Sequence, residues 1–134
     1  MSEIYRAQNL VQVYGTVTAL SLASFSVKKG EVVALTGPNG SGKSTLLRLL
    51  AFLEKPSAGE LLFFGQGDDP RREVTLLLQE PYLLKDTVFR NVTLGLALRG
   101  KTSNLKAAFE TVMHAVGFED AETMGKRFFH ARFW

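Results

Sequence analysis

The 134-residue sequence contains no cysteine, which excludes a disulfide framework, a cysteine-based metal site and a cysteine nucleophile. It has no uncharged run near the roughly 18 residues that a membrane-spanning helix needs. Its first residues also lack the apolar core of a secretion signal. These absences favour a reducing compartment and a soluble or peripheral protein.

Charge of one sign is nowhere concentrated. The 16 Lys and Arg residues are scattered among 13 acidic ones, giving a net charge of +3 at pH 7. Without a long basic run, a nucleic-acid partner is not indicated. Hydrophobic residues make up 46% and charged residues 22% of the chain, as in an ordinary globular domain. The sequence therefore predicts one folded domain with a solvated, mixed-charge surface.

The most informative feature present is a glycine-rich loop at residues 37–45, Gly-Pro-Asn-Gly-Ser-Gly-Lys-Ser-Thr. Residues 31–36 (EVVALT) before it predict a short buried strand, and residues 44–52 (STLLRLLAF) after it predict a helix. The pattern G-x-x-x-x-G-K-S between a strand and a helix is typical of a loop that binds nucleotide triphosphates. The alternative, a merely flexible turn rich in Gly, Pro and Asn, does not require those flanking elements.

Each residue type in this loop has a chemical reason to be there. Glycines let successive backbone NH groups turn inward around phosphate, and the following helix adds unpaired NH groups and its positive dipole end. Lys43 is expected near the β- and γ-phosphates, Ser44 as a Mg²⁺ ligand and Thr45 as a second polar contact. The predicted nucleotide-binding residues of the loop are Gly37, Pro38, Asn39, Gly40, Ser41, Gly42, Lys43, Ser44 and Thr45.

Other stretches predict a mixed α/β organisation. The first thirty residues alternate apolar and polar positions and predict an antiparallel β layer. Residues 60–64 predict another strand, and residues 74–78 a core strand that ends at Gln79 and Glu80, where polar groups are well placed for a ligand.

Two helices are expected after these strands. The first is capped by Asp86 and ends near Gly100. The second presents one apolar face and ends near Gly117; the face comprises Leu105, Ala108, Phe109, Val112 and Val116. The last seven residues, 128–134, change composition abruptly and hold four aromatic residues, including the only tryptophan.

In this order, the motifs resemble the ATP-binding subunit of an ABC transporter, from the first residues to about Gly125. The resemblance implies that Tyr14 stacks on the adenine ring and that residues 57–60 form the family's serine–glycine turn. It also implies that Gln79 is the Q-loop glutamine, which reaches Mg²⁺ and the attacking water. Lys43 and Gln79 are then the expected catalytic residues, and Ser44 and Gln79 the expected Mg²⁺ ligands. The ordinary alternatives are simple packing for Tyr14 and no special role for Gln79.

The resemblance also implies an α/β fold: a P-loop NTPase core with a partly parallel sheet, an N-terminal antiparallel β layer and the start of a helical subdomain. The expected division is an ATP-binding core at residues 1–85, the start of a helical subdomain at 86–127 and an atypical tail at 128–134. A membrane permease subunit is the expected partner, through apolar burial of its helix in a groove. The groove residues are Tyr82, Leu83, Leu84 and Val88, whose alternative role is ordinary core.

Several family motifs do not occur in the 134 residues: the L-S-G-G-Q-type signature, the strand ending in Asp-Glu and the later switch histidine. His114 and His130 lie before the signature's expected place and do not replace them. We interpret the chain as truncated or frame-disrupted, with a natural short variant as the alternative. Poor hydrolysis by the chain alone is expected, because the general base and the second-shell aspartate of the metal site are missing. Unpaired strand edges predict aggregation or partial disorder.

The resulting functional hypothesis is ATP binding, with Mg²⁺, by a subunit of an importer on the cytoplasmic side of the plasma membrane. In the intact family two such subunits pair as a homodimer or heterodimer. The alternatives are a non-catalytic nucleotide-binding fragment and a soluble ABC-type ATPase unconnected with transport. A small-molecule P-loop kinase would not explain Tyr14 and Gln79 together. Residues 77–84 resemble importers of small ions such as oxyanions.

Overall fold

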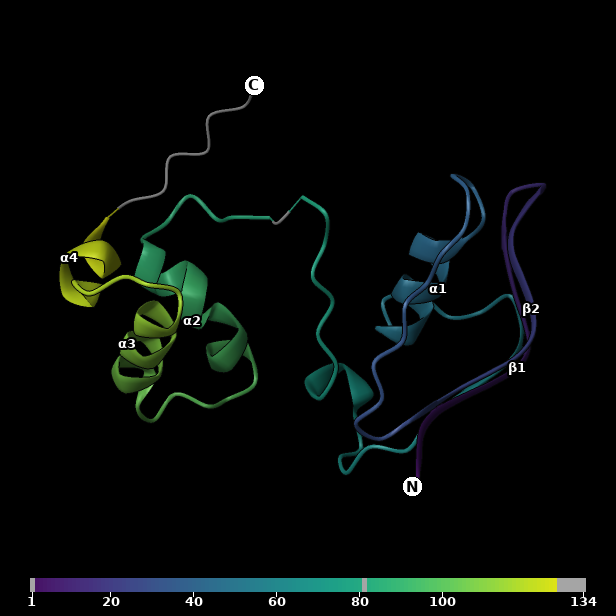
Figure 1. The fold of residues 1–134 in the computed structure, drawn as a ribbon, viewed down its shortest axis with the longest axis horizontal. Helices are drawn as coiled ribbons and strands as arrows, with labels where there is room; N and C mark the ends of the chain where they lie inside the picture. Colours follow the sequence, from purple (N-terminus) through teal and green to yellow (C-terminus); the bar gives the residue numbers. More distant parts are fainter. Residues whose placement is uncertain (1, 81, 128–134) are drawn as a thin grey trace. The chain divides into compact units, whose positions relative to one another are not determined.

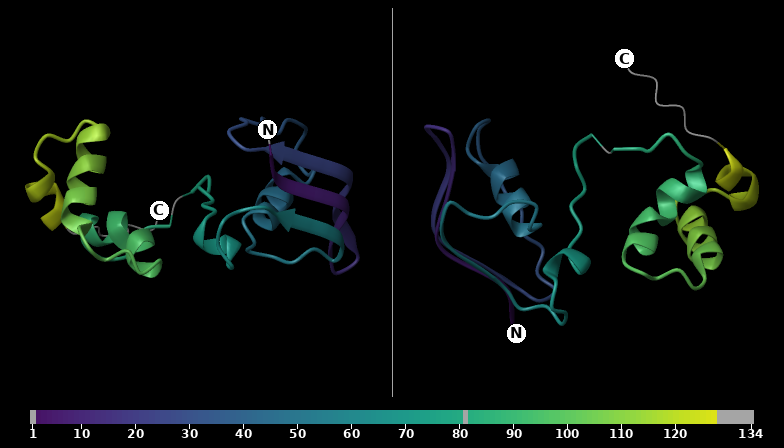
Figure 2. Two further views of the ribbon diagram at one scale, coloured as in Figure 1. Left: turned by 90° about the horizontal axis from the view of Figure 1, so that it is seen from below. Right: turned by 180° about the vertical axis from the view of Figure 1, so that it is seen from behind.

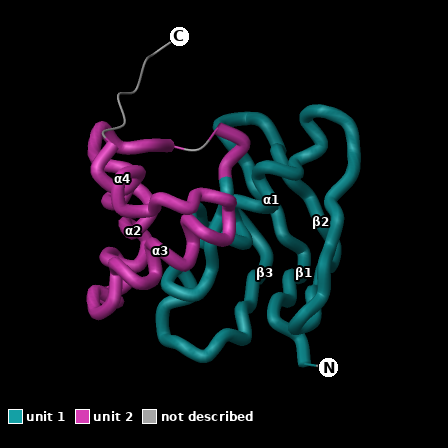
Figure 3. Tube along the Cα trace, turned by 60° about the vertical axis from the view of Figure 1, so that its left-hand side comes forward, with its two compact units in different colours: residues 1–77 teal, residues 78–134 magenta. Residues whose placement is uncertain are grey.

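The computed structural model describes residues 2–80 and 82–127. The chain divides into two compact units, residues 1–77 and residues 78–134, shown in teal and magenta in Figure 3. Each unit is described by itself.

The first unit is built on a three-stranded antiparallel sheet, seen in Figures 1 and 2. The strands are β1 (Glu3–Tyr14), β2 (Val17–Lys28) and β3 (Ala58–Phe63), with β1 in the centre. β1 and β2 form a hairpin in which Tyr14 pairs with Val17. The expected antiparallel β layer is thus confirmed, and the strand expected at residues 60–64 is present with its start two residues earlier.

Helix α1 (Lys43–Leu50) packs its apolar face on this sheet. Leu46 and Leu49, three residues apart and therefore on one face of the helix, are both buried. Leu49 and Leu10 of β1 are completely inaccessible to solvent. The buried core of this unit consists of Ala7, Leu10, Leu20, Leu46 and Leu49.

Two expected strands do not form. Residues 31–36 and residues 74–78 carry no regular secondary structure, and their apolar side chains are largely in solvent, with Val32 96% and Leu77 84% exposed. A strand needs a hydrogen-bonded neighbour on at least one side, and the three strands of the sheet are paired with one another. The prediction of strands at these two segments was wrong for this structure, because within its described residues no neighbouring strand pairs with them. A short 3₁₀ helix, η1 (Pro70–Arg72), lies between β3 and residues 74–78.

The described residues of the second unit form three helices: α2 (Val88–Leu98), α3 (Leu105–Ala115) and α4 (Ala121–Lys126). Its small core consists of Phe109, Met113 and Ala121, against which Val88, Phe89 and Met124 pack. The rings of Phe89 and Phe109 meet edge to face, with centroids 5.1 Å apart. None of the helices within residues 2–80 and 82–127 is long and apolar enough to cross a membrane.

Two helices agree with expectation in place but not in detail. The cap of α2 is Thr87, whose hydroxyl accepts a hydrogen bond from Arg90 N at 3.2 Å, and not Asp86, which accepts from Thr87 N at 2.7 Å. On α3, the buried face is made by Phe109 and Met113, whereas Val112 and Val116 are 47% and 63% exposed. The buried face of α3 is therefore rotated about the helix axis relative to the face expected from the residue spacing. The C-terminal aromatic segment lies outside the described residues.

Candidate functional site

The glycine-rich loop adopts the backbone conformation that its sequence predicts. Gly37, Gly40 and Gly42 have φ angles of 148°, 82° and 85°, a region that other residues rarely adopt. At Gly42 the space is closed as well, because an added Cβ would lie 2.6 Å from the carbonyl oxygen of Ala19 on β2. The loop is thus held against the hairpin at its last glycine.

Helix α1 begins at Lys43, within the loop motif, with Gly42 as its N-cap. No described side chain caps its first turn, and this turn contains no acidic residue. The first NH groups of a helix have no partner inside the helix, so this end offers donors and a positive dipole end to an anion. Ser44 is exposed here, whereas Thr45 is only 6% exposed and faces inward.

The ammonium group of Lys43 folds back over the loop. Its Nζ donates to the carbonyl oxygens of Gly37 at 2.8 Å and Pro38 at 2.7 Å, and lies 3.4 Å from the Ser41 hydroxyl. The Lys43 ammonium is thus placed directly beside the backbone of the glycine-rich loop. This arrangement suits an anion with several oxygens, such as a polyphosphate.

Tyr14 lies at the end of β1 in the same unit as the loop, with 41% of the residue exposed. Its hydroxyl donates a hydrogen bond to Glu54, which follows α1 in the chain. That hydrogen bond raises the pKa of the Tyr14 phenol, and desolvation acts in the same direction. Sequence reasoning predicted Tyr14 but missed Glu54, since a glutamate in a surface loop carries no motif signal.

The serine–glycine turn fastens β1 to β3. The backbone NH of Ser57 donates to the Gln12 side chain at 3.0 Å and to the Val11 carbonyl at 2.9 Å, while its hydroxyl accepts from the backbone NH of Val13 at 3.0 Å. Gln12 is 7% exposed, a buried polar side chain satisfied by this turn. Its only sequence signal was a polar residue within an apolar strand.

Gln79 is exposed and belongs to the second unit, whereas the loop belongs to the first. Tyr82, Leu83 and Leu84 also lie in the second unit and are 89%, 40% and 41% exposed. Val88 differs from them, because it packs against the helical core.

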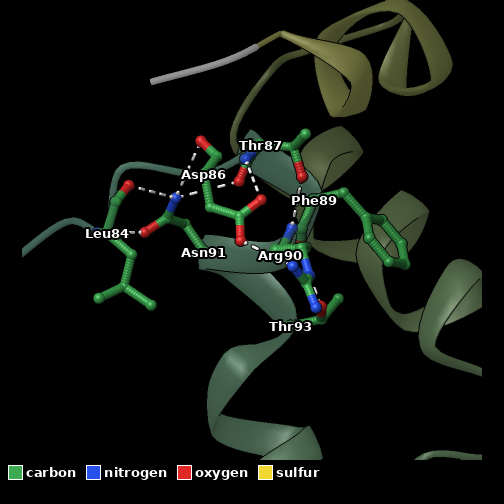
Figure 4. A network of polar contacts seen from close by, with 7 residues as sticks. All are labelled: Leu84, Asp86, Thr87, Phe89, Arg90, Asn91 and Thr93. Atoms are coloured by element: carbon green, nitrogen blue, oxygen red, sulfur yellow. Dashed lines mark hydrogen bonds and ion pairs between the residues drawn. The ribbon is translucent and has the colours of Figure 1, made fainter. Parts of the chain in front are cut away.

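Asn91, on α2, fixes the segment that carries these exposed side chains (Figure 4). Its Oδ1 accepts from Leu84 N at 2.7 Å, and its Nδ2 donates to the carbonyl oxygens of Leu84 and Thr87, each at 3.0 Å. A longer contact of 3.4 Å reaches the Asp86 carbonyl. One amide thus ties the backbone of residues 84–87 to the first turns of the helix.

The residues at the loop fit a magnesium ion of the kind that accompanies a polyphosphate. Among residues 2–80 and 82–127, no three His, Cys, Asp or Glu side chains are grouped to hold a metal. Mg²⁺ bound with nucleotides commonly takes only one or two protein ligands and completes its shell with phosphate oxygens and water. The exposed Ser44 hydroxyl at the start of α1 is a donor of that type.

Sequence comparison gives a consistent family match. The family described as ABC transporter matches residues 20–131. The chain is 40% identical over 99 residues to a sulfate/thiosulfate import ATP-binding protein of Pectobacterium atrosepticum, covering 70% of this chain and 30% of that protein. It is 46% identical over 95 residues to an aliphatic sulfonates import ATP-binding protein of Shouchella clausii, covering 70% and 36%.

A longer match joins the chain to a tungstate uptake system ATP-binding protein of Peptoclostridium acidaminophilum, with 32% identity over 114 residues, covering 84% of this chain and 53% of that protein. Among solved structures, cbiO1 of Clostridium perfringens, part of an ABC transporter complex, superposes with a TM-score of 0.72 at 26% identity. That match covers 96% of this chain and 55% of the solved chain. The chain thus spans about half or less of the length of these relatives.

Proposed function

The chain belongs to the ABC transporter family, and from that premise we propose that it binds the triphosphate of ATP at residues 37–45, with Mg²⁺ at Ser44 and the adenine on Tyr14. The observation that carries the proposal is the loop itself: glycines in left-handed conformations, an uncapped helix start and an ammonium beside its backbone. The described carbonyl contacts of Lys43 are interactions that phosphate oxygens can replace, because those oxygens carry full negative charge.

The individual roles follow from chemistry. Backbone NH groups of the loop and of the first turn of α1 hold the phosphates, and Lys43 neutralises their charge. The Tyr14 ring offers a π face to the adenine, a contact that requires no hydrogen-bond match. Magnesium bound with the nucleotide would screen the phosphate oxygens, with Ser44 supplying a ligand; Gln79 is proposed as a second ligand and as the group that orients water.

We further propose that the subunit works with a membrane permease, on the cytoplasmic face, through Tyr82, Leu83, Leu84 and Val88. Three of these four side chains are exposed, which supports a docking role. The named relatives import sulfate, thiosulfate, aliphatic sulfonates or tungstate. All of these are oxyanions, so an oxyanion importer is the proposed setting. Co-purification of a membrane protein with the tagged chain, lost in a Leu83→Asp/Leu84→Asp variant, would support this partner.

Nucleotide binding is tested by titrating the purified chain with a fluorescent ATP analogue in the presence of Mg²⁺. Lys43→Ala should weaken binding by roughly 10- to 100-fold, because a hydrogen bond to a charged group contributes about 1.5–3 kcal/mol. Lys55→Ala is the matched control, since Lys55 is an exposed lysine in the same unit. Absence of saturable binding to folded wild-type chain would refute the proposal.

Hydrolysis is a separate question. We propose that the 134 residues alone hydrolyse ATP poorly, because they contain no signature sequence and no Asp-Glu pair after an apolar strand. Phosphate release is measured on the wild-type chain and on Lys43→Ala. Magnesium-dependent turnover near one per second that disappears in the variant would overturn this part. Saturable ATP binding with no turnover would support it and would equally suit a non-catalytic nucleotide-binding fragment.

A further inference from the structure

A chain of polar contacts links the end of β1 to helix α1 within the first unit. The Tyr14 hydroxyl donates to Glu54 Oε2, and Glu54 Oε1 lies 3.2 Å from Arg48 Nε on α1. Glu54 thus accepts one hydrogen bond, from Tyr14, and forms an ion pair with Arg48, whose Nε–H lies within range of the carboxylate but makes no hydrogen bond.

This arrangement leaves the Tyr14 side chain partly exposed while Glu54 holds its hydroxyl group. Tyr14 remains 41% exposed, whereas the side chain of Glu54 is 28% exposed. A tyrosine side chain without a hydrogen-bond partner samples several staggered rotamers. Stacking a base on its ring would restrict it to one rotamer, and this loss of conformational entropy would weaken binding. A phenol anchored at its hydroxyl has already lost much of that freedom.

We propose that Glu54 and Arg48 are positioning residues that hold the Tyr14 ring in register with the phosphate loop, so that base and triphosphate are bound together. This inference rests on the proposed function, because it assumes that Tyr14 receives the adenine. Glu54 orients the ring through the hydroxyl, and Arg48 orients Glu54 from the same helix that begins at the loop.

The proposal predicts an effect that depends on the base. Glu54→Ala and Tyr14→Phe should each weaken ATP binding by about three- to tenfold, the scale expected for one side chain that must be ordered on binding. Binding of inorganic tripolyphosphate, which has no base, should be unchanged in both. Because both variants remove the same interaction, the double variant should bind ATP no more weakly than either single variant.

Calorimetric titration with Mg-ATP and with Mg-tripolyphosphate tests this on the full chain. Glu54→Gln, which keeps a hydrogen-bond acceptor, should restore most of the ATP affinity, and Arg48→Met should give a smaller loss than Glu54→Ala. Glu119→Ala, a change at an exposed glutamate of the second unit, is the control. Tripolyphosphate binding shows in every variant that the phosphate loop is folded.

Three results would overturn the inference: wild-type ATP affinity in Glu54→Ala, equal losses for ATP and tripolyphosphate, or additive losses in the double variant. The two levels of the argument remain distinguishable. If the wild-type chain binds neither ligand, the proposed function fails and the positioning role fails with it. If the wild-type chain binds both and the variants match it, only the positioning role fails.

Discussion

The two compact units complete their backbone hydrogen bonds in different ways. In residues 1–77 the ordered sheet depends on partners far apart in the sequence, such as Ala7 opposite Leu61. In residues 78–134 the described structure is helical, and the backbone hydrogen bonds inside each helix join residues that are close in the sequence. A helical segment therefore forms wherever its own residues permit, whereas an apolar strand segment needs a neighbour. This difference explains why α2 and α3 formed as expected while residues 31–36 and 74–78 stayed outside the sheet.

The same contrast explains how the phosphate loop is ordered without a preceding strand. Its conformation depends on local glycine geometry, on the start of α1 and on the contact between Gly42 and Ala19 of β2. The antiparallel hairpin thus supports the loop in place of the strand that the motif is expected to follow.

The largest expected effect on stability comes from creating a cavity in either hydrophobic core. Leu49→Ala should lower the free energy of unfolding of the first unit by about 2–5 kcal/mol, and Phe109→Ala that of the second by about 3–5 kcal/mol. Both side chains are almost completely buried, at 0% and 3% exposure. Hydrogen exchange should show lost protection in the sheet and α1 for the first variant and in α2–α4 for the second.

The control for both core variants is Leu98→Ala, since Leu98 is 78% exposed. It should leave protection in both units unchanged. Loss of protection in both units on either core substitution would contradict the view that each unit has its own core.

Sequence reasoning succeeded where the determinants are local. The loop glycines, the antiparallel β layer of the first thirty residues, and the positions of α1, α2 and α3 follow from residue type and spacing within a few positions. It failed where the outcome depends on partners: residues 31–36 and 74–78 have the composition of strands, but composition does not supply a neighbouring strand. The short helix α4 was missed because six residues around Gly125 carry little helical signal.

The same distinction between local and tertiary determinants applies to the residues of the candidate site. The loop residues were predicted from the glycine-rich motif, and Tyr14 was predicted from the family resemblance. Glu54 and Arg48 were not, because their role depends on a tertiary contact across 40 residues of sequence. Nothing in the sequence indicated a role for Asn91, and that role emerges from its contacts with the backbone of residues 84–87.

A smaller effect is expected from Asn91→Ala, which should lower the free energy of unfolding of the second unit by about 1–3 kcal/mol, the usual cost of leaving hydrogen-bonding groups unsatisfied. Residues 84–87 should also become accessible, so trypsin should cleave after Lys85 faster. Asn91→Asp keeps the acceptor for Leu84 N but loses the donor, and it should lie between wild type and alanine. Unchanged cleavage at Lys85 in the alanine variant would show that the amide does not hold this segment.

Low pH should reduce the stability of the two units by protonating a different carboxylate in each. Glu73 accepts from the backbone NH groups of Gln66 and Gly67, which lower its pKa from 4.5, and Asp120 caps α4 through Thr123, whose hydrogen bonds lower its pKa from 3.8. A pKa that is lower in the folded state adds stability that is complete above the ordinary value and is lost as pH falls through the folded value. Stability should therefore decline below about pH 4.5 in the first unit and below about pH 3.8 in the second.

Nuclear magnetic resonance signals from each unit can follow this decline separately. Glu73→Gln should reduce the pH dependence of the stability of the first unit and leave that of the second unit unchanged. Asp120→Asn should have the opposite pattern. The expected changes are smaller than that of Asn91→Ala, because both carboxylates are exposed and screened by water. An Asp120→Asn variant that changes the acid response of the sheet signals would contradict the assignment.

The smallest change in folding free energy, within about 0.5 kcal/mol, is expected for Val32→Lys and Leu77→Lys, because both side chains are already in solvent. Their effect should appear instead in self-association. Exposed apolar segments that lie outside a sheet favour contact between chains, and a lysine there opposes such contact. Light scattering should show a smaller mean particle mass for the double variant. Leu98→Lys changes a leucine that is also largely exposed, at 78%, but lies on helix α2, so it should leave association as in wild type. A matching decrease from Leu98→Lys would attribute association to general surface hydrophobicity and not to the two apolar segments outside the sheet.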